Sequence, residues 1–332
     1  MKPLKHLPAW KTLETHFKTM RTFDMRSAFR EDPRRFEHLS LRCGNLLLDY
    51  SKNRITADTM TQLLQLARES DLETQRSAMF SGERINFTER RAVLHTALRA
   101  PVRPPLVVEG VDVEREVAKV LKRMQRFVES IHNGSWLGYT GKPVRDVVNI
   151  GIGGSDLGPA MVCAALDHYA LESMRVHFVS NLDPAHLAST LAHLDPETTL
   201  FIVASKTFTT LETLANEKFV CRALVEAGLD PAKHCIAVTG ENSPLDDPTN
   251  YLESFYMHDY IGGRYSSTSM VGAVMLGFAL GIDQVMDFLH GASDIDKLAE
   301  EKDVRRNMPL LLALLGIWNH NFLGYPTLAV LP

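Results

Sequence analysis

Residues 200–213 read LFIVASKTFTTLET, an apolar run followed at once by a turn rich in hydroxyl side chains. The run 200–204 has the length and composition of a buried strand, and a helical pattern begins after Thr210. A strand that passes through a polar turn into a helix is typical of a βαβ unit, in which neighbouring strands run parallel. This stretch therefore predicts a parallel sheet covered by helices.

Similar units lie on both sides of this stretch. Further strand candidates, each followed by a helical pattern or a turn, are residues 147–150, 176–179 and 235–238. Repeated βαβ units predict a doubly wound α/β domain with three layers, α-β-α, which we place at residues 116–292.

The segments outside this domain differ from it. Residues 1–115 are predicted to form a helical arm, joined through the proline-rich segment 101–110 to a helix at 113–131. Residues 293–332 are predicted to begin a second α/β domain, with an apolar helix at 309–323 and a buried strand at 327–332; a strand added to the edge of the first sheet is the alternative. Apolar residues at helical spacing in the arm include Leu46, Leu47, Leu48, Met60, Leu63, Leu64, Leu66 and Ala67.

Composition excludes several classes of protein. A net charge of −4 disfavours a nucleic-acid binder, and 45% hydrophobic residues argue against a disordered chain. No run of 18 apolar residues predicts a membrane span. The four cysteines are scattered, so we expect reduced thiols and a cytoplasmic protein. The histidines lack two-ligand spacing, so no metal is expected.

The turn after the run 200–204 has the chemistry of a phosphate site. Ser205, Lys206, Thr207 and Thr210 supply hydroxyls and an ammonium where a strand ends and a helix begins, which suits a phosphate dianion. The alternative is a hydroxyl-rich helix cap that faces solvent.

Two more segments carry glycines and polar groups. Residues 149–159, NIGIGGSDLGP, follow the strand candidate 147–150 but do not fit the G-x-G-x-x-G dinucleotide pattern. Asp156 would place a carboxylate near a pyrophosphate, so an NAD-dependent oxidoreductase is a weak rival. Residues 259–266, DYIGGRYS, contain Arg264, whose guanidinium could stabilise an oxyanion.

Together these segments resemble the phosphoglucose isomerase family of the sugar isomerase superfamily. The resemblance also covers residues 49–54, 79–86, 88–95, 140–142 and 180–181, in the family's order. It implies an aldose-ketose isomerase of glycolysis and gluconeogenesis, which interconverts glucose 6-phosphate and fructose 6-phosphate through a cis-enediolate without cofactor or metal.

The resemblance also implies roles for individual residues. Ser205, Lys206, Thr207 and Thr210 would hold the phosphate, Gly154 and Ser155 would line the sugar site, and Arg264 would stabilise the enediolate. Departures from the family pattern, which suggest a divergent bacterial member, are Leu211, Ser267, Thr268 and His258.

The resemblance places the remaining catalytic groups outside this sequence. The family's general base, a glutamate, is expected beyond Pro332, as are a histidine donated by the partner subunit of a homodimer and a lysine. The 332-residue chain is therefore expected to be inactive alone. The alternative is a sugar-phosphate-binding module without catalysis.

Overall fold

The computed structural model describes residues 3–99, 105–207 and 209–330. By its contacts the chain divides into two compact units, one made of residues 79–293 and the other of residues 1–78 with 294–332. Each unit has its own hydrophobic core. None of the helices in the described ranges is long and apolar enough to cross a membrane.

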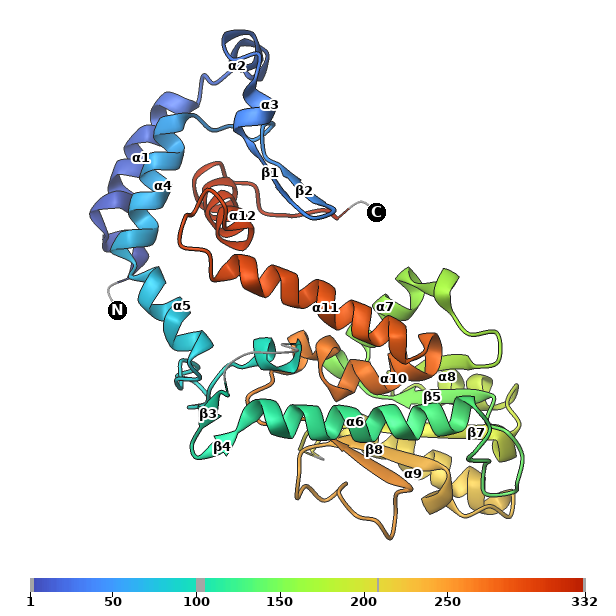
Figure 1. The fold of residues 1–332 in the computed structure, drawn as a ribbon. Helices are drawn as coiled ribbons and strands as arrows, with labels where there is room; N and C mark the ends of the chain where they lie inside the picture. The colour runs from blue at the N-terminus through green and yellow to red at the C-terminus, as the bar shows by residue number, and fades with distance from the viewer. Residues whose placement is uncertain (1–2, 100–104, 208, 331–332) are drawn as a thin grey trace. The chain divides into compact units, whose positions relative to one another are not determined.

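A parallel sheet of five strands lies at the centre of the unit 79–293 (Figure 1). The spatial order is β6-β5-β7-β8-β9, and every neighbouring pair is parallel. The four strands expected from the sequence are confirmed. The fifth, β9, was missed because its short run of polar and aromatic residues resembles a loop. The strands are β5 (Asp146–Ile150), β6 (Arg175–Val179), β7 (Thr199–Ala204), β8 (Cys235–Thr239) and β9 (Glu253–Tyr256).

Helices cover both faces of the sheet, which confirms the predicted three-layer α/β fold. Alternate residues of β7 face opposite cores: Leu200 and Ile202 pack with α6, α7, α10 and α11, whereas Phe201 and Val203 pack with α8 and α9. The helices are α6 (Val113–His132), α7 (Leu157–Ala165), α8 (Pro184–Leu191), α9 (Leu211–Glu226), α10 (Met270–Leu280) and α11 (Ile282–Ala299).

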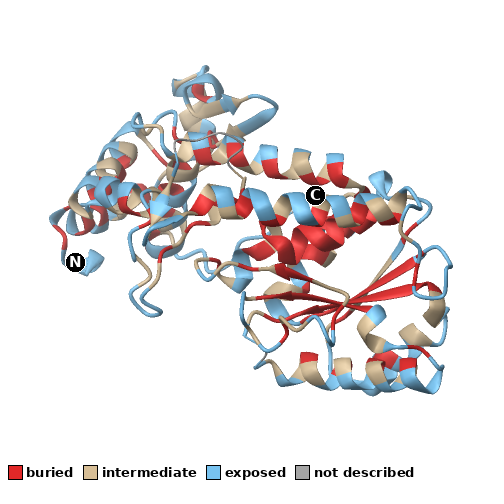
Figure 2. Cartoon of the chain, turned by 60° about the horizontal axis from the view of Figure 1, so that its bottom comes forward, coloured by how far each residue is buried: buried red, intermediate tan, exposed pale blue. Residues whose placement is uncertain are grey.

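Helix α10 is the buried centre of the first of these layers. All of its residues from Met270 to Leu280 are buried, as Figure 2 shows. The hydroxyl of Ser269 accepts a hydrogen bond from the amide of Val271 and so caps the helix. A helix that is apolar on every side is stable only inside a core, which is where α10 lies.

The other unit is built mainly from helices. Trp318, fully buried, donates a hydrogen bond to the carbonyl of Arg54 and packs on Phe17 and Phe322. The expected apolar helix at 309–323 is confirmed as α12 with a π-helical turn at Trp318–Phe322. The helices of this unit are α1 (Pro8–Met20), α2 (Met25–Glu31), α3 (Arg35–His38), α4 (Ala57–Glu69), α5 (Leu72–Phe80) and α12 (Met308–Ile317).

Two predictions for this unit are wrong. Leu46, Leu47 and Leu48 do not lie on a helix; they belong to strand β2 (Leu46–Asp49), which forms an antiparallel hairpin with β1 (Ser40–Cys43) because the turn contains Gly44 at φ +51°. Residues 327–330 are exposed and form no strand; Leu328 is 91% exposed. No described strand pairs with them, and an unpaired apolar segment cannot be buried as a strand.

The first segment of the larger unit also differs from the expected arm. Residues 79–99 pack with the α/β unit, and a second hairpin, β3 (Val107–Val108) with β4 (Val111–Asp112), leads into α6. Residues 101–104 of the predicted proline-rich connection lie outside the described residues. The division into 1–115, 116–292 and 293–332 stays a prediction.

Candidate functional site

The order of the strands places two turns beside each other. The chain leaves β5, forms β6 on one side of it, and returns to form β7 on the other side, so β5 and β7 flank the point where the strand order reverses. Ligands of doubly wound sheets bind at the carboxyl ends of the strands at this point. The turn after β5 contains Gly154 and Ser155, and the turn after β7 contains Ser205–Thr210.

The turn after β7 brings hydroxyls together. Ser205 is 3% exposed, and its hydroxyl lies 3.5 Å from that of Thr210. The hydroxyls of Thr207 and Thr209 lie 2.7 Å apart. Thr210 is the N-cap residue of α9, but its side chain does not cap the helix, so the first amides of α9 keep their donors for another acceptor. Phe208 lies outside the described residues.

Lys206 is held by the loop after β9. Its ammonium donates to the carbonyls of Asp259, at 2.7 Å, and Ile261, at 3.2 Å, and lies 3.1 Å from the Asp259 carboxylate. Burial lowers the pKa of Lys206, which the contact with Asp259 partly opposes. The ammonium therefore ties the hydroxyl turn to the segment that leads to Arg264.

Asp259 receives a second cation. Arg91 donates to its carbonyl oxygen at 2.6 Å and to its carboxylate at 3.3 Å. Burial acts to raise the pKa of Asp259, but the contacts with Lys206 and Arg91 outweigh it and hold the pKa below its usual value. Sequence reasoning missed Arg91 and Asp259 as site residues, although both lie in segments that carry the family resemblance.

The glycine turn after β5 touches the arginine segment directly. A Cβ at Gly154 would lie 2.0 Å from the carbonyl oxygen of Gly263, so only glycine fits this approach. The hydroxyl of Ser266 donates to the carbonyl of Gly263 at 2.6 Å and lies 3.2 Å from that of Gly154. The backbone carbonyl of Ser155 accepts a hydrogen bond from Asn149 at 3.0 Å.

Arg264 follows this contact and is exposed. It lies in a 3₁₀ turn, Gly263–Thr268, and forms no ion pair with any residue in the described ranges. His95 supports the turn from below, because its Nε2 accepts the amide proton of Gly262 at 3.0 Å. Burial lowers the pKa of His95, and the ring is accordingly neutral. The guanidinium of Arg264 is thus available to an anion.

Asp156 closes the glycine turn with a buried carboxylate. The residue is 5% exposed, burial raises its pKa, and its Oδ1 has no hydrogen-bond partner among the described atoms. A carboxylate at the start of α7 repels a pyrophosphate at that helix end, where a dinucleotide would place one. This geometry disfavours the oxidoreductase alternative.

The three predicted segments therefore converge at one edge of the sheet. Gly154 contacts Gly263, and Lys206 contacts the loop at 259–261. The donors are hydroxyls, an ammonium, a guanidinium and helix-terminal amides, and in the described ranges no group of three His, Cys, Asp or Glu could hold a metal ion. Hydroxyls and cations at a switch point define a class of α/β proteins that bind phosphorylated ligands.

Comparison with known proteins identifies the family within this class. The family model for phosphoglucose isomerase matches residues 49–332. The chain is 63% identical to "Glucose-6-phosphate isomerase 1" of Thiobacillus denitrificans and 49% identical to "Glucose-6-phosphate isomerase" of Methylococcus capsulatus, covering 100% and 98% of this chain. The chain therefore belongs to the phosphoglucose isomerase family.

A solved structure agrees with this assignment. The crystal structure of a glucose-6-phosphate isomerase from Chlamydia trachomatis superposes with a TM-score of 0.89 at 37% identity, over 98% of this chain and 62% of that one. The chain spans 61% and 60% of the two curated relatives' own length.

Proposed function

We propose that this chain is part of an aldose-ketose isomerase that interconverts glucose 6-phosphate and fructose 6-phosphate, and that it supplies the substrate-binding side of the site. The convergence of the hydroxyl turn, the glycine turn and the arginine turn at the switch point carries the proposal. The names of the family's members support the substrate.

The proposed roles follow the chemistry of each group. The hydroxyls of Ser205, Thr207 and Thr210, with the first amides of α9, bind the phosphate dianion. Lys206 adds positive potential and holds the turn against the loop of Asp259. Gly154 and Ser155 form the wall on which the sugar lies.

Arg264 acts on the reacting part of the substrate in this proposal. An enediolate carries negative charge on oxygen that the ground state lacks, so a guanidinium placed there stabilises the transition state more than the substrate. Arg264 is exposed and unpaired with any described acid, and the guanidinium stays protonated over the physiological range.

We further propose that the general base is a glutamate outside these 332 residues and that the intact enzyme is a cytoplasmic homodimer of glycolysis and gluconeogenesis. On this proposal the chain binds the substrate but does not isomerise it. Isomerisation by the purified chain, with host enzyme removed, would contradict the placement of the base.

Binding of glucose 6-phosphate tests the proposed site. The variant S205A/T210V removes two hydroxyls at nearly constant volume, and we expect it to weaken binding, measured by calorimetry, by about tenfold or more because charge-assisted hydrogen bonds are lost. The matched control S189A/T190V removes the same atoms from α8, where both hydroxyls bond only to the carbonyl of His186.

The outcomes separate the alternatives. Equal weakening in both double variants, or no binding at all, would overturn the proposed phosphate site. Binding of NAD instead of glucose 6-phosphate would favour the oxidoreductase. If the full-length enzyme also bound the sugar phosphate without converting it, the non-catalytic module would be the better description.

A further inference from the structure

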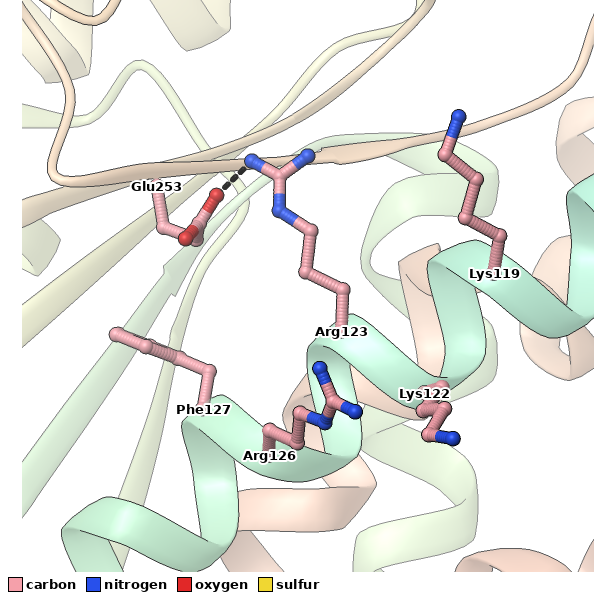
Figure 3. Close-up of a pocket in the computed structure, with 6 residues that line it drawn as sticks. All are labelled: Lys119, Lys122, Arg123, Arg126, Phe127 and Glu253. Carbon is pink, nitrogen blue, oxygen red and sulfur yellow. Dashed lines mark hydrogen bonds and ion pairs between the residues drawn. The ribbon is translucent and has the colours of Figure 1, made fainter.

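The central turns of α6 carry a cluster of cations that the proposed isomerase site does not use. Its members lie three, four and seven positions apart and so share one face of the helix. With two further residues they line a cavity of about 490 Å³ between α6 and β9, which we call the basic cleft (Figure 3). It is lined by Lys119, Lys122, Arg123, Arg126, Phe127 and Glu253.

The helix dipole does not account for this cluster. Cations stabilise a helix within its last turn, which in α6 contains His132. The cluster lies in the middle of the helix, where the dipole has little effect and where like charges three and four positions apart repel one another.

Nearby carboxylates neutralise only part of the charge. Glu253 forms an ion pair with Arg123, and Glu116 lies 3.5 Å from Lys119. Lys122 and Arg126 have no acidic partner among the residues that the structure describes. The cleft therefore keeps a positive potential, although the chain as a whole has a net charge of −4.

The floor of the cleft is held in place by packing. The Arg123 guanidinium lies 5.9 Å from the ring centre of Phe255 and 5.7 Å from that of Tyr256. The ring of Phe127 packs on Phe255 at 5.8 Å and on Trp136 at 5.9 Å. A preformed floor reduces the entropy lost when a ligand binds.

The basic cleft is separate from the proposed substrate site. Glu253 is the first residue of β9, so it lies at the amino end of a strand, whereas the hydroxyl, glycine and arginine turns follow the carboxyl ends. The two sites share no residue, and an anion in the cleft would lie at the opposite edge of the parallel sheet.

We propose that the basic cleft binds a small soluble anion that carries several phosphate groups. Lysine and arginine are the side chains that bind phosphate oxygens, and cations spread over two helical turns match several phosphates better than one. The volume lies in the range of small-molecule sites, about 300–1,000 Å³. The Phe127 ring gives the ligand an apolar contact beside its charges.

Calorimetry with inorganic triphosphate tests this proposal on the 332-residue chain. We expect one triphosphate to bind in the cleft, with an affinity that falls as salt rises. The variant K122Q/R126Q removes the two unpaired cations, and we expect it to weaken binding by about tenfold or more. The control K218Q/R222Q makes the same change in net charge on the exposed face of α9.

Further arms assign each result. Equal weakening in the α6 and α9 variants would show a general charge effect and overturn the proposal, as would failure of triphosphate to bind. Loss of triphosphate binding in S205A/T210V but not in K122Q/R126Q would place the ligand at the switch-point turns and also overturn it. Unchanged binding of glucose 6-phosphate to K122Q/R126Q would support two separate sites and show that this variant is folded.

Discussion

At the scale of the residue, Gly154 shows how closely the site is packed. Its missing Cβ leaves room for the carbonyl of Gly263, and a methyl group there would lie 2.0 Å from that oxygen. Backbone must then move, because no flexible side chain is available to give way. We expect Gly154→Ala to lower the free energy of unfolding by about 1–3 kcal/mol, as overpacking does, and to weaken binding of glucose 6-phosphate.

A second glycine supplies the control for this experiment. Gly291 lies in α11 with nothing within 4 Å of its Cβ position, so Gly291→Ala should be neutral or stabilise the protein by about 0.5–1 kcal/mol. Urea unfolding of both variants measures the difference. Equal free energies of unfolding for the two variants would rule out the proposed steric role of Gly154.

His95 makes stability depend on pH. Because burial lowers its pKa in the folded protein, the unfolded chain binds more protons below its usual value, 6.5. The stability that His95 contributes is complete above pH 6.5 and is lost as pH falls from there toward the folded pKa.

Replacing His95 by glutamine removes this proton while keeping an acceptor for the amide of Gly262. We therefore expect His95→Gln to lose less free energy of unfolding than the wild type between pH 8 and pH 5.5, measured by urea titration at each pH. An identical loss in both proteins would show that His95 does not titrate on unfolding.

At the scale of the element, β7 carries the core on both of its faces. Phe201 is 2% exposed and packs toward α8 and α9. Phe201→Ala should lower the free energy of unfolding by about 3–5 kcal/mol, through lost apolar burial and a cavity. The same substitution at Phe219, which is 42% exposed on α9, should have a much smaller effect. Thermal unfolding of the two variants compares them directly.

The elements also show what could be predicted from the sequence. The central strands were predictable because long apolar runs such as 200–204 are buried on both faces of a parallel sheet. Strand β9 was not, because only Ser254 and Phe255 of its four residues are buried. Leu46, Leu47 and Leu48 resemble a helix by composition, whereas tertiary pairing with β1 determines their conformation.

The site was predictable in type more than in geometry. Hydroxyls and glycines after strands indicate an anion site from local sequence alone. The contacts of Lys206 and Arg91 with Asp259 join positions 53 and 168 residues apart, and no local pattern reports such contacts. The basic cleft was missed because cations at helical spacing most often lie on a solvated surface.

At the scale of the whole molecule, two cores predict two unfolding transitions. Trp10 and Trp318 lie in the core of one unit, and Trp136 packs in the other. Fluorescence of a W136F variant should report unfolding of the unit that holds Trp318, and that of W10F/W318F should report the α/β unit. We expect Phe201→Ala to shift only the second signal. A shift of both signals by the same amount would mean that the units unfold together.

The strand order has a consequence for protein synthesis. A ribosome that has released residues up to Ala204 has made β5, β6 and β7, which can already pair, but the arginine turn is still about sixty residues away. Until that turn emerges, the nascent glycine turn lacks the backbone against which it packs. Translation therefore finishes the sheet's scaffold well before a hexose ester could find a complete place to bind.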